Sequence, residues 1–170
     1  MENQREERGR PIFNGDLCAQ RMAKKMDKTE IKKILPHRES MLLIDEAELQ
    51  DGISESKVSV AKYTVRGDEF FLQGHFPGNP VVPGVILCEM MAQSACLLVD
   101  ANDNENCTPF FTSMDKVKFK SKVVPGDCVI FKSEVVRQKS IFYFVKSAGY
   151  VNDVLCVTGE LSFALVKNEQ

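Results

Sequence analysis

Histidine is scarce in this chain, since only His37 and His75 occur among its 170 residues. Six cysteines are present, but none of them forms a Cys-x-x-Cys pair, so no zinc site of known spacing can be built from these residues. The sequence therefore predicts no metal site. The cysteines are interpreted as reduced, mostly buried thiols of a cytosolic protein: Cys18, Cys88, Cys96, Cys107, Cys128 and Cys156.

The chain also lacks a strong net charge and an apolar run of membrane length. Its formal charge is -2 and its pI is about 5.8, which gives no general attraction to nucleic acid or anionic lipid. A charged partner must then be met by a local patch. Glu89 interrupts the only long apolar run, so no transmembrane helix is predicted.

The first 26 residues lack hydrophobic periodicity. Acidic and basic residues alternate there without an apolar core, which excludes a secretory signal and is unlike an acid-poor transit peptide. We therefore expect residues 1–26 to be a flexible extension. Residues 27–170 are expected to form one domain, because a chain with 44% hydrophobic residues and this length can bury a single core.

Hydrophobic periodicity in the domain predicts two helices and six strands. The final strand is the clearest, because its apolar residues from Leu155 to Leu165 alternate with polar ones, as in a sheet with one covered face. A helix that is apolar nearly all round, beginning at Gly84, is predicted to cover that face. The pattern indicates an α+β fold, an antiparallel sheet curled around a central buried helix. The predicted helices span 28–35 and about 84–99, and the predicted strands span 41–46, 54–65, 109–123, 128–138, 141–151 and 154–166.

Glu89 lies inside the apolar helix, where a carboxylate must be paired or protonated because burying an isolated charge is costly. His75 precedes this helix in a turn whose prolines and glycines restrict the backbone and aim the side chain. We hypothesise that His75 accepts a proton and that Glu89, kept neutral by desolvation, donates one. The alternative is a buried Glu89–His75 salt bridge that only stabilises the fold.

Residues near this pair are expected to assist it. Gln93 lies one helical turn after Glu89 and is predicted either to orient its carboxylate or to contact a second subunit. Gly84 and Val85 offer backbone N–H groups at a helix N-terminus, which suits them to stabilise an oxyanion.

Four lysines alternate with apolar residues and are predicted to line one face of a strand: Lys116, Lys118, Lys120 and Lys122. They form either a docking surface for an acidic partner or an ordinary solvated face. His37 is interpreted as structural, because it has no acidic neighbour in sequence closer than Glu39. Cys88 is not expected to be a nucleophile, since its surroundings are apolar.

Several motifs then identify a family resemblance: Leu35-Pro36-His37-Arg38, Gly74-His75-Phe76-Pro77-Gly78, Pro83-Gly84-Val85, Glu89-Met90-Met91-Ala92-Gln93, Asp115-Lys116-Val117-Lys118-Phe119 and Pro125-Gly126-Asp127. With these motifs, about residues 28–167 resemble the β-hydroxyacyl-(acyl-carrier-protein) dehydratases of bacterial type II fatty acid synthesis, of the FabZ type. The resemblance implies a hot-dog fold, a cytoplasmic enzyme and subunits that pair so that their sheets join, usually as a trimer of dimers.

The resemblance also implies roles for individual residues. His75 of one subunit would face Glu89 of the other, take the α-proton of a 3-hydroxyacyl thioester and leave Glu89 to protonate the departing hydroxyl. The Gly84 N–H would polarise the thioester carbonyl, and the product would be a trans-2-enoyl thioester. Other substrate-site residues would be Val85, Phe76, Phe110 and Gln93. No metal or redox cofactor is implied, and the substrate would arrive on the phosphopantetheine of an acidic acyl carrier protein.

Two positions refine this expectation. Glu89 stands where dehydratase-isomerases typically carry aspartate, which favours a dehydratase without isomerase activity. Phe110 stands where some relatives have a gating tyrosine, so gating through a hydroxyl is not expected. A hot-dog thioesterase and a non-catalytic module that binds acyl thioesters are the competing hypotheses, and the second of these would not need the Glu89 carboxylate.

Overall fold

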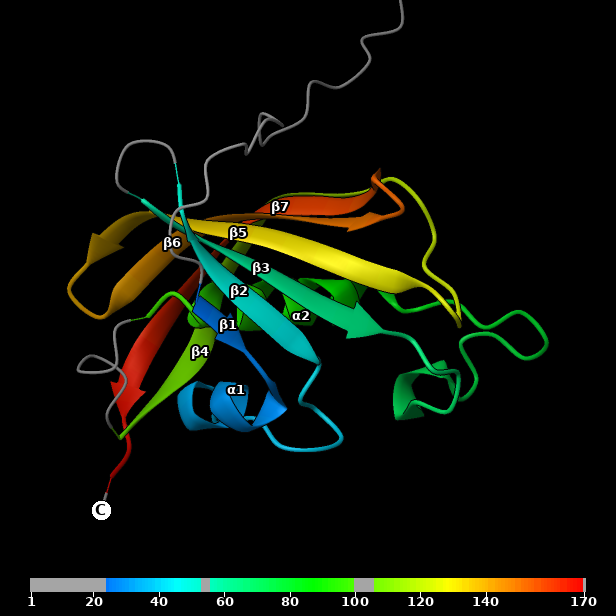
Figure 1. The fold of residues 1–170 in the computed structure, drawn as a ribbon, viewed down its shortest axis with the longest axis horizontal. Coiled ribbons are helices and arrows are strands. Elements are labelled where there is room, and N and C mark those ends of the chain that lie inside the picture. The colour runs from blue at the N-terminus through cyan, green and yellow to red at the C-terminus, as the bar shows by residue number, and fades with distance from the viewer. Residues whose placement is uncertain (1–23, 53–55, 100–105, 170) are drawn as a thin grey trace, which may run out of the picture.

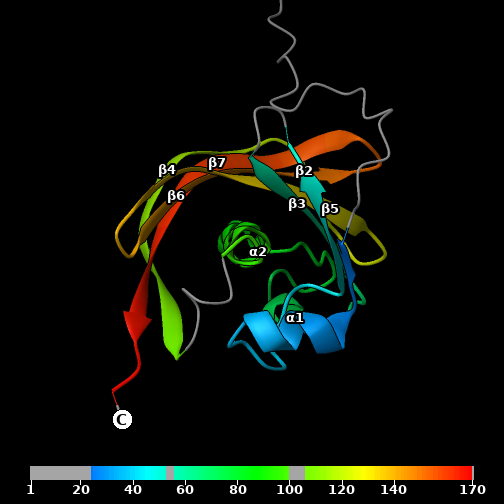
Figure 2. The same cartoon turned by 60° about the vertical axis from the view of Figure 1, so that its left-hand side comes forward.

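One curved antiparallel sheet wraps around a central helix. The structure, a computed structural model, describes residues 24–52, 56–99 and 106–169. The sheet of the described residues has the strand order β1-β2-β3-β5-β6-β7-β4 and arches over helix α2, while helix α1 lies on the other side of α2 (Figure 1, Figure 2). The predicted α+β hot-dog arrangement is thereby confirmed. The elements are β1 Lys24–Met26, α1 Lys28–Ile34, β2 Glu46–Asp51, β3 Lys57–Thr64, the 3-10 helix η2 Phe70–Leu72, α2 Gly84–Cys96, β4 Cys107–Phe119, β5 Cys128–Lys139, β6 Phe142–Val151 and β7 Val154–Lys167.

Helix α2 is buried because it is apolar on almost every side. Nine of its 13 residues are buried, and Met90 and Met91 have no exposed surface. The helix contacts β3, β5, β6 and β7. Burying a large apolar side chain contributes about 1.5–3 kcal/mol, so the contact between α2 and the sheet is the main source of the core's stability.

A row of buried serines fixes α2 against the sheet. The Ser59 hydroxyl in β3 donates to the Ser94 carbonyl in α2 at 2.6 Å, and the Ser133 hydroxyl in β5 donates to the Ser94 hydroxyl at 3.0 Å. Ser133 also bonds the Ser147 hydroxyl in β6 at 2.7 Å. Small side chains let the helix approach the strands, and paired hydroxyls avoid the cost of buried unsatisfied groups. The network sets the height and rotation of α2, which carries Glu89.

Two sequence predictions at the start of the domain were wrong. The predicted strand 41–46 is an irregular segment, and β2 begins only at Glu46. The backbone N–H of Leu43 donates to the Gln93 side chain in α2 at 2.9 Å, so this part of the backbone bonds a helix rather than a strand. Lys24–Met26, assigned to the extension, form strand β1 on the edge of β2. Residues 1–23 lie outside the described residues.

The final strand has the predicted position but not the predicted simple alternation. The register between β6 and β7 shifts after the Gly149–Val157 pair, so that Tyr150 pairs with Leu155. Cys156 is the extra residue of this bulge and is buried, while Leu155 is only half-buried. Helix α2 also ends earlier than predicted, at Cys96. The predicted loop 100–106 lies, apart from Asn106, outside the described residues.

Asp45 ties the irregular segment to β3 and is expected to contribute to stability. Its carboxylate accepts hydrogen bonds from the Thr64 N–H at 2.9 Å, Arg66 Nη2 at 2.8 Å and Lys28 Nζ at 3.2 Å. Burial raises the pKa of Asp45, but these three donors together outweigh burial, so the pKa lies below its usual value.

We predict that Asp45→Asn lowers the free energy of unfolding at pH 7 by about 1–3 kcal/mol, because a charged hydrogen-bond acceptor is lost. Because the pKa of Asp45 is lower in the folded state, the ionised carboxylate stabilises the fold fully at pH values above the unfolded pKa of about 3.9. This stabilisation is lost as the pH falls through the folded-state pKa. Urea unfolding at pH 7 and at acid pH should therefore show a difference between wild type and variant that shrinks in acid. The control is Glu46→Gln, because Glu46 forms only an exposed ion pair with Lys62 at 3.7 Å, and losing this pair should change the free energy of unfolding little. An equal loss of unfolding free energy in Glu46→Gln would contradict the stabilising role assigned to Asp45.

Candidate active site

His75 is aimed by the backbone that surrounds it. Its Nδ1 lies 2.8 Å from the Val81 carbonyl oxygen, and the Val81 N–H donates to the His75 carbonyl at 2.8 Å. The turn between them contains Gly78 with a φ of 72°, and Gly74 before it has a φ of 93°, conformations that favour glycine. A carbonyl oxygen only accepts, so Nδ1 carries the ring proton and Nε2 keeps its lone pair. His75 is thus arranged as a proton acceptor.

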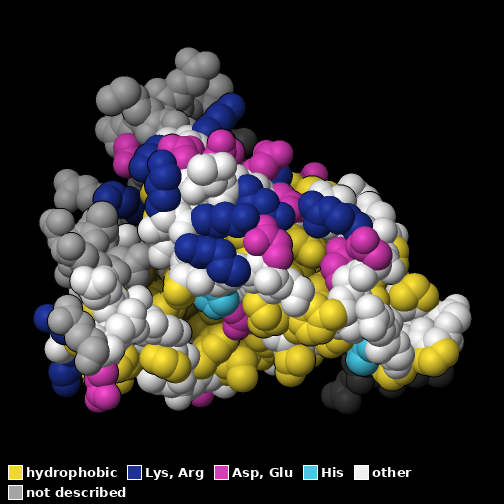
Figure 3. Space-filling view, turned by 90° about the horizontal axis from the view of Figure 1, so that it is seen from below, with side chains coloured by type: hydrophobic (Ala, Val, Ile, Leu, Met, Phe, Trp, Pro, Cys, Tyr) yellow, Lys and Arg dark blue, Asp and Glu magenta, His cyan; other side chains and the backbone are white. Residues whose placement is uncertain are grey.

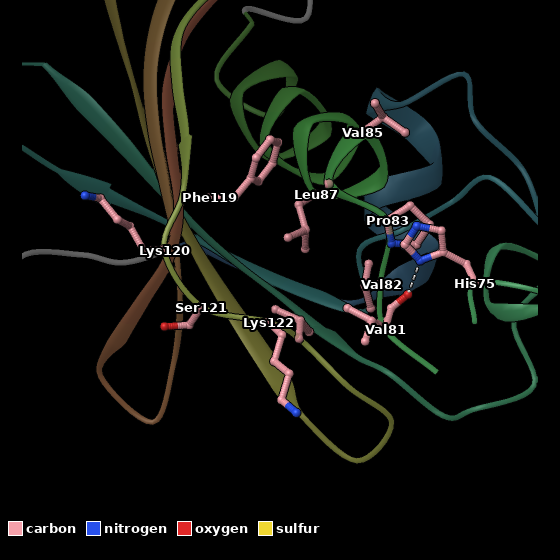
Figure 4. A pocket seen from close by; sticks show the side chains of 12 residues that line it. His75, Val81, Val82, Pro83, Val85, Leu87, Phe119, Lys120, Ser121 and Lys122 are labelled. Carbon is pink, nitrogen blue, oxygen red and sulfur yellow. Dashed lines mark hydrogen bonds between the residues drawn. The ribbon is translucent and has the colours of Figure 1, made fainter. Parts of the chain in front are cut away.

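The imidazole borders a cavity between the described elements. The cavity has a volume of about 600 Å³ and lies between the start of α2 and the segment that follows β4. Figure 4 shows His75 and its bond to Val81 on one side of this cavity and Phe119 on the other. The walls are mainly apolar, as an acyl-thioester site would require. The lining residues are His75, Val81, Val82, Pro83, Gly84, Val85, Leu87, Phe119, Lys120, Ser121, Lys122 and Val123.

Gly84 opens α2 at the cavity wall. Within the described parts of the chain, the N–H groups of Gly84 and Val85 have no hydrogen-bond acceptor, as expected for the first turn of a helix. A Cβ on Gly84 would lie 2.8 Å from the Phe119 ring, so the ring packs here because the residue has no side chain. Val85 is 69% exposed. The two predicted N–H donors therefore have no acceptor within the described residues, and both residues line the cavity that His75 borders.

Glu89 does not bond His75 within one chain. Its Oε1 lies 3.1 Å from His37 Nε2 and accepts a hydrogen bond from Gln93 Nε2 at 2.8 Å. Among the described residues of a single chain, no hydrogen bond or ion pair joins Glu89 to His75. The interpretation of a Glu89–His75 salt bridge inside the chain is therefore wrong.

The partners of Glu89 also change its expected protonation. Burial raises the pKa of Glu89, but the hydrogen bonds from His37 and Gln93 and the charge of His37 outweigh burial, so the pKa lies below its usual value. The expectation that desolvation keeps Glu89 neutral is therefore wrong for the isolated chain. Its donors favour the carboxylate.

Gln93 makes the predicted contact with Glu89, and its side-chain amide is fixed by three hydrogen bonds. Its Nε2 donates to both Glu89 and the Met41 carbonyl, the latter at 2.7 Å, and its Oε1 accepts from the Leu43 N–H. The side chain is 1% exposed. All polar atoms of the amide are used, so the amide is a rigid support for the Glu89 carboxylate.

His37 is the functional candidate that the sequence analysis missed. It was interpreted as structural because its nearest acidic neighbour in sequence is Glu39, whereas the fold brings Glu89 of α2 to its ring. The only sequence signal was indirect, since a carboxylate on a buried helix needs a partner and the chain has two histidines. Both histidines (cyan) are visible on one face of the molecule with hydrophobic side chains between them (Figure 3).

Three further predictions have mixed outcomes. Phe76 stacks on the His75 ring with centroids 4.1 Å apart and is 55% exposed. Phe110 is 54% exposed on β4 and does not line the cavity. Burial raises the pKa of the Cys88 thiol, which agrees with its interpretation as unreactive.

The lysine row does not form one sheet face. Lys116 has a φ of 53° in an irregularity of the β4–β7 register and pairs with Glu160 at 3.0 Å. Lys120 and Lys122 follow the end of β4 and lie at the cavity, where Figure 4 shows them extending away from His75. The bulge breaks the alternation that the prediction assumed.

Two features are absent from the described residues. No helix there is long and apolar enough to cross a membrane. No group of three or more histidine, cysteine, aspartate or glutamate side chains is placed there to hold a metal ion.

Known proteins resemble this chain in sequence and in fold. A family model described as a FabA-like domain matches residues 35–160. A protein of Clostridium perfringens (strain SM101) named 3-hydroxyacyl-(acyl-carrier-protein) dehydratase FabZ is 41% identical over 141 residues, which are 82% of this chain and 99% of that protein. A FabZ dehydratase of Petrotoga mobilis is 39% identical over 143 residues, 84% of this chain and 100% of that one.

Solved structures support the fold alone, because their sequence identities are low. A hot-dog-like protein from Thermanaerovibrio acidaminovorans gives a TM-score of 0.55 at 17% identity and covers 66% of this chain and 83% of its own. A chain of the dehydratase heterocomplex ApeI:P from Xenorhabdus doucetiae gives 0.52 at 20% identity, covering 63% and 87%.

Gly84→Ala tests the close approach of Phe119 to the helix start. Because the Phe119 ring is 55% exposed and can shift, we predict a change in unfolding free energy within about 1 kcal/mol. The displaced ring would narrow the cavity, so kcat/KM for an acyl-thioester substrate should fall on the order of tenfold. Thermal unfolding and steady-state kinetics check both expectations, with Gly159→Ala as the control, because an added Cβ there would lie 2.9 Å from Val117 Cγ2 outside the cavity. Unchanged kinetics would refute the role of this contact in shaping the site.

Proposed function

The chain belongs to the FabA-like family and within it to the FabZ-type 3-hydroxyacyl-(acyl-carrier-protein) dehydratases, and from this membership we propose that His75 and Glu89 perform the dehydration. The enzyme is a hydro-lyase of type II fatty acid synthesis that converts a (3R)-hydroxyacyl thioester to the trans-2-enoyl thioester. The observation that carries the proposal is the bond from His75 Nδ1 to the Val81 carbonyl, which in the neutral imidazole places the lone pair on Nε2, in a residue that lines a cavity together with Gly84 and Val85.

His75 acts as the general base. Its Nε2 takes the proton from Cα of the substrate, whose acidity rises when the thioester carbonyl accepts a hydrogen bond. The N–H groups of Gly84 and Val85 border the same cavity and have no acceptor in the described chain. Charge that develops on the carbonyl oxygen is stabilised there without reorganisation of the protein.

Glu89 acts as the general acid that protonates the departing hydroxyl. In the isolated chain its pKa is lowered by its donors, and its side chain is 20% exposed. Covering this surface with a second subunit and substrate removes water, which favours the neutral acid. Product formation then leaves Glu89 as a carboxylate and His75 as an imidazolium, and proton exchange restores both.

The active site is shared between two chains. Among the described residues, His75 and Glu89 have separate partners within one chain, which fits a site to which two copies each contribute one of these residues. Strand β4 ends the sheet and exposes apolar side chains along its 13 residues, including Phe110, Phe111, Met114 and Phe119. A long exposed apolar edge is suited to pairing with another copy. We assign the enzyme a dimer with shared sites, assembled as a trimer of dimers.

The partner that delivers the substrate is an acyl carrier protein. Lys120 and Lys122 lie at the cavity and suit the approach of an acidic protein with a phosphopantetheine arm. The proposed steps use only protein groups, so they require no cofactor. Free cysteines such as Cys88, Cys96 and Cys128 fit a reducing cytoplasm.

Single substitutions test the two roles. We predict that His75→Ala and Glu89→Gln each lower kcat on the order of 100- to 10,000-fold, because a proton-transfer group is lost while the fold remains. The measurement follows loss of enoyl absorbance during hydration of a trans-2-enoyl thioester, the reverse reaction. Circular dichroism and thermal unfolding establish that the variants are folded.

Cys88→Ser is a matched control, because it changes the neighbour of Glu89 on α2 without touching the proposed chemistry. Near wild-type hydration by Glu89→Gln would exclude the general acid and favour a binding module. Hydrolysis of the thioester in place of hydration would instead favour a thioesterase.

Mixing the two inactive variants tests the shared site. If the residues come from different chains, a mixed dimer of His75→Ala and Glu89→Gln subunits has one intact site, and random mixing should restore about a quarter of wild-type activity. The variants are co-expressed in equal amounts with the same tag, so that subunits pair at random, and the mixture is purified and assayed. Mixed dimers as inactive as either parent would place His75 and Glu89 of each site in the same chain.

A further inference from the structure

The proposed reaction leaves the second histidine without a role. His37 follows α1 and reaches Glu89, with Nε2 3.1 Å from Oε1 and side chains that are 23% and 20% exposed, respectively. The segment is held by Arg38, whose Nη1 donates to the Leu35 carbonyl at 3.0 Å and the His37 carbonyl at 2.7 Å. Leu35 is extended with a ψ of 131°, as expected before Pro36. The backbone therefore fixes where the His37 ring lies.

The contacts of the ring show which nitrogen donates to Glu89. Within the described residues, His37 Nδ1 is buried and has no hydrogen-bond partner. Nε2 lies 3.1 Å from Glu89 Oε1, and a carboxylate oxygen accepts in such a contact. Nε2 therefore carries a proton and donates to Glu89 Oε1.

Both donors to Glu89 converge on one oxygen. His37 Nε2 and Gln93 Nε2 bond Oε1, whereas no hydrogen bond of the described chain involves Oε2. The last torsion of a glutamate side chain is broad and nearly two-fold symmetric, so a single donor would fix the carboxyl plane poorly. Two donors from different directions define both the plane and which oxygen is left free.

We propose that His37 is a positioning residue that acts through Glu89, holding Oε1 together with Gln93 so that Oε2 carries and delivers the proton in the dehydration. The inference rests on the proposed function. As the Cα–H bond breaks toward His75, its electron pair forms the double bond, and the C–O pair leaves with the hydroxyl, which takes the proton from Oε2. Negative charge then develops on Glu89, and the two donors at Oε1 stabilise it.

Gln93 alone does not replace His37 in this arrangement. The Gln93 amide is shared among Glu89, Met41 and Leu43, so its position is set by the backbone and it offers Glu89 one direction of approach. The His37 ring comes from the segment between α1 and β2, outside α2. Removing it frees the carboxyl group to rotate and removes one donor that stabilises its charge.

The test compares His37→Ala and His37→Gln, each in the wild-type and the Glu89→Gln background. The glutamine amide can donate to Oε1 from a similar place, whereas alanine cannot. We expect His37→Ala to lower kcat on the order of tenfold with little change in KM, as for the loss of one hydrogen bond to a charged group. His37→Gln should recover most of that loss. In the Glu89→Gln background, His37→Ala should have almost no further effect.

Glu39→Gln is the matched control, since Glu39 lies on the same segment and pairs with Lys32 at 2.8 Å, away from Glu89. It should leave kcat unchanged. Equal losses of kcat from His37→Ala in both backgrounds would overturn the positioning role, and so would a failure of His37→Gln to recover kcat. The Glu89→Gln variant shows separately whether the general acid is required. Wild-type activity of Glu89→Gln would overturn the proposed function itself, and the His37 role with it.

Discussion

The burial of α2 inside the curved sheet is the constraint on which the rest of the structure depends. A helix with nine buried residues among 13 leaves no surface on which a charged side chain can be solvated cheaply. Glu89 therefore needs donors from neighbouring segments, and the irregular segment before β2 supplies them through His37 and the backbone that anchors Gln93. The absence of a strand at 41–45 is a consequence, because those backbone groups bond the helix.

The two proton-transfer groups are organised in opposite ways. His75 is oriented by its own loop, through the Val81 carbonyl, and keeps its lone pair at the cavity. Glu89 is oriented by side chains from elsewhere, which stabilise its charge. Two groups with different environments can hold different protonation states at one pH, which acid–base catalysis requires. In the proposed dimer, the two groups of one site would come from different chains.

Helix and strand positions followed well from the sequence because their periodicity is local. The strands from residue 107 onward agree with the predicted runs to within a few residues, and the burial of α2 followed from its composition. Predictions that depended on alternation over a bulge were less successful. Lys116 and Cys156 both lie at register shifts, and a bulge moves every later side chain to the other face. Such shifts depend on the neighbouring strand, which a local pattern does not contain.

The sequence by itself determined that Glu89 lies on a buried helix and needs a partner, and that His75 lies in a constrained turn before the helix, because apolar composition and proline or glycine placement act locally. Only the tertiary structure decided which partner Glu89 has. His37 and Glu89 are far apart along the chain and meet because α1 and α2 lie on the same side of the sheet (Figure 2). That contact sets the direction of the Glu89 pKa shift, since a charge responds to the groups around it in space and not to its neighbours in sequence.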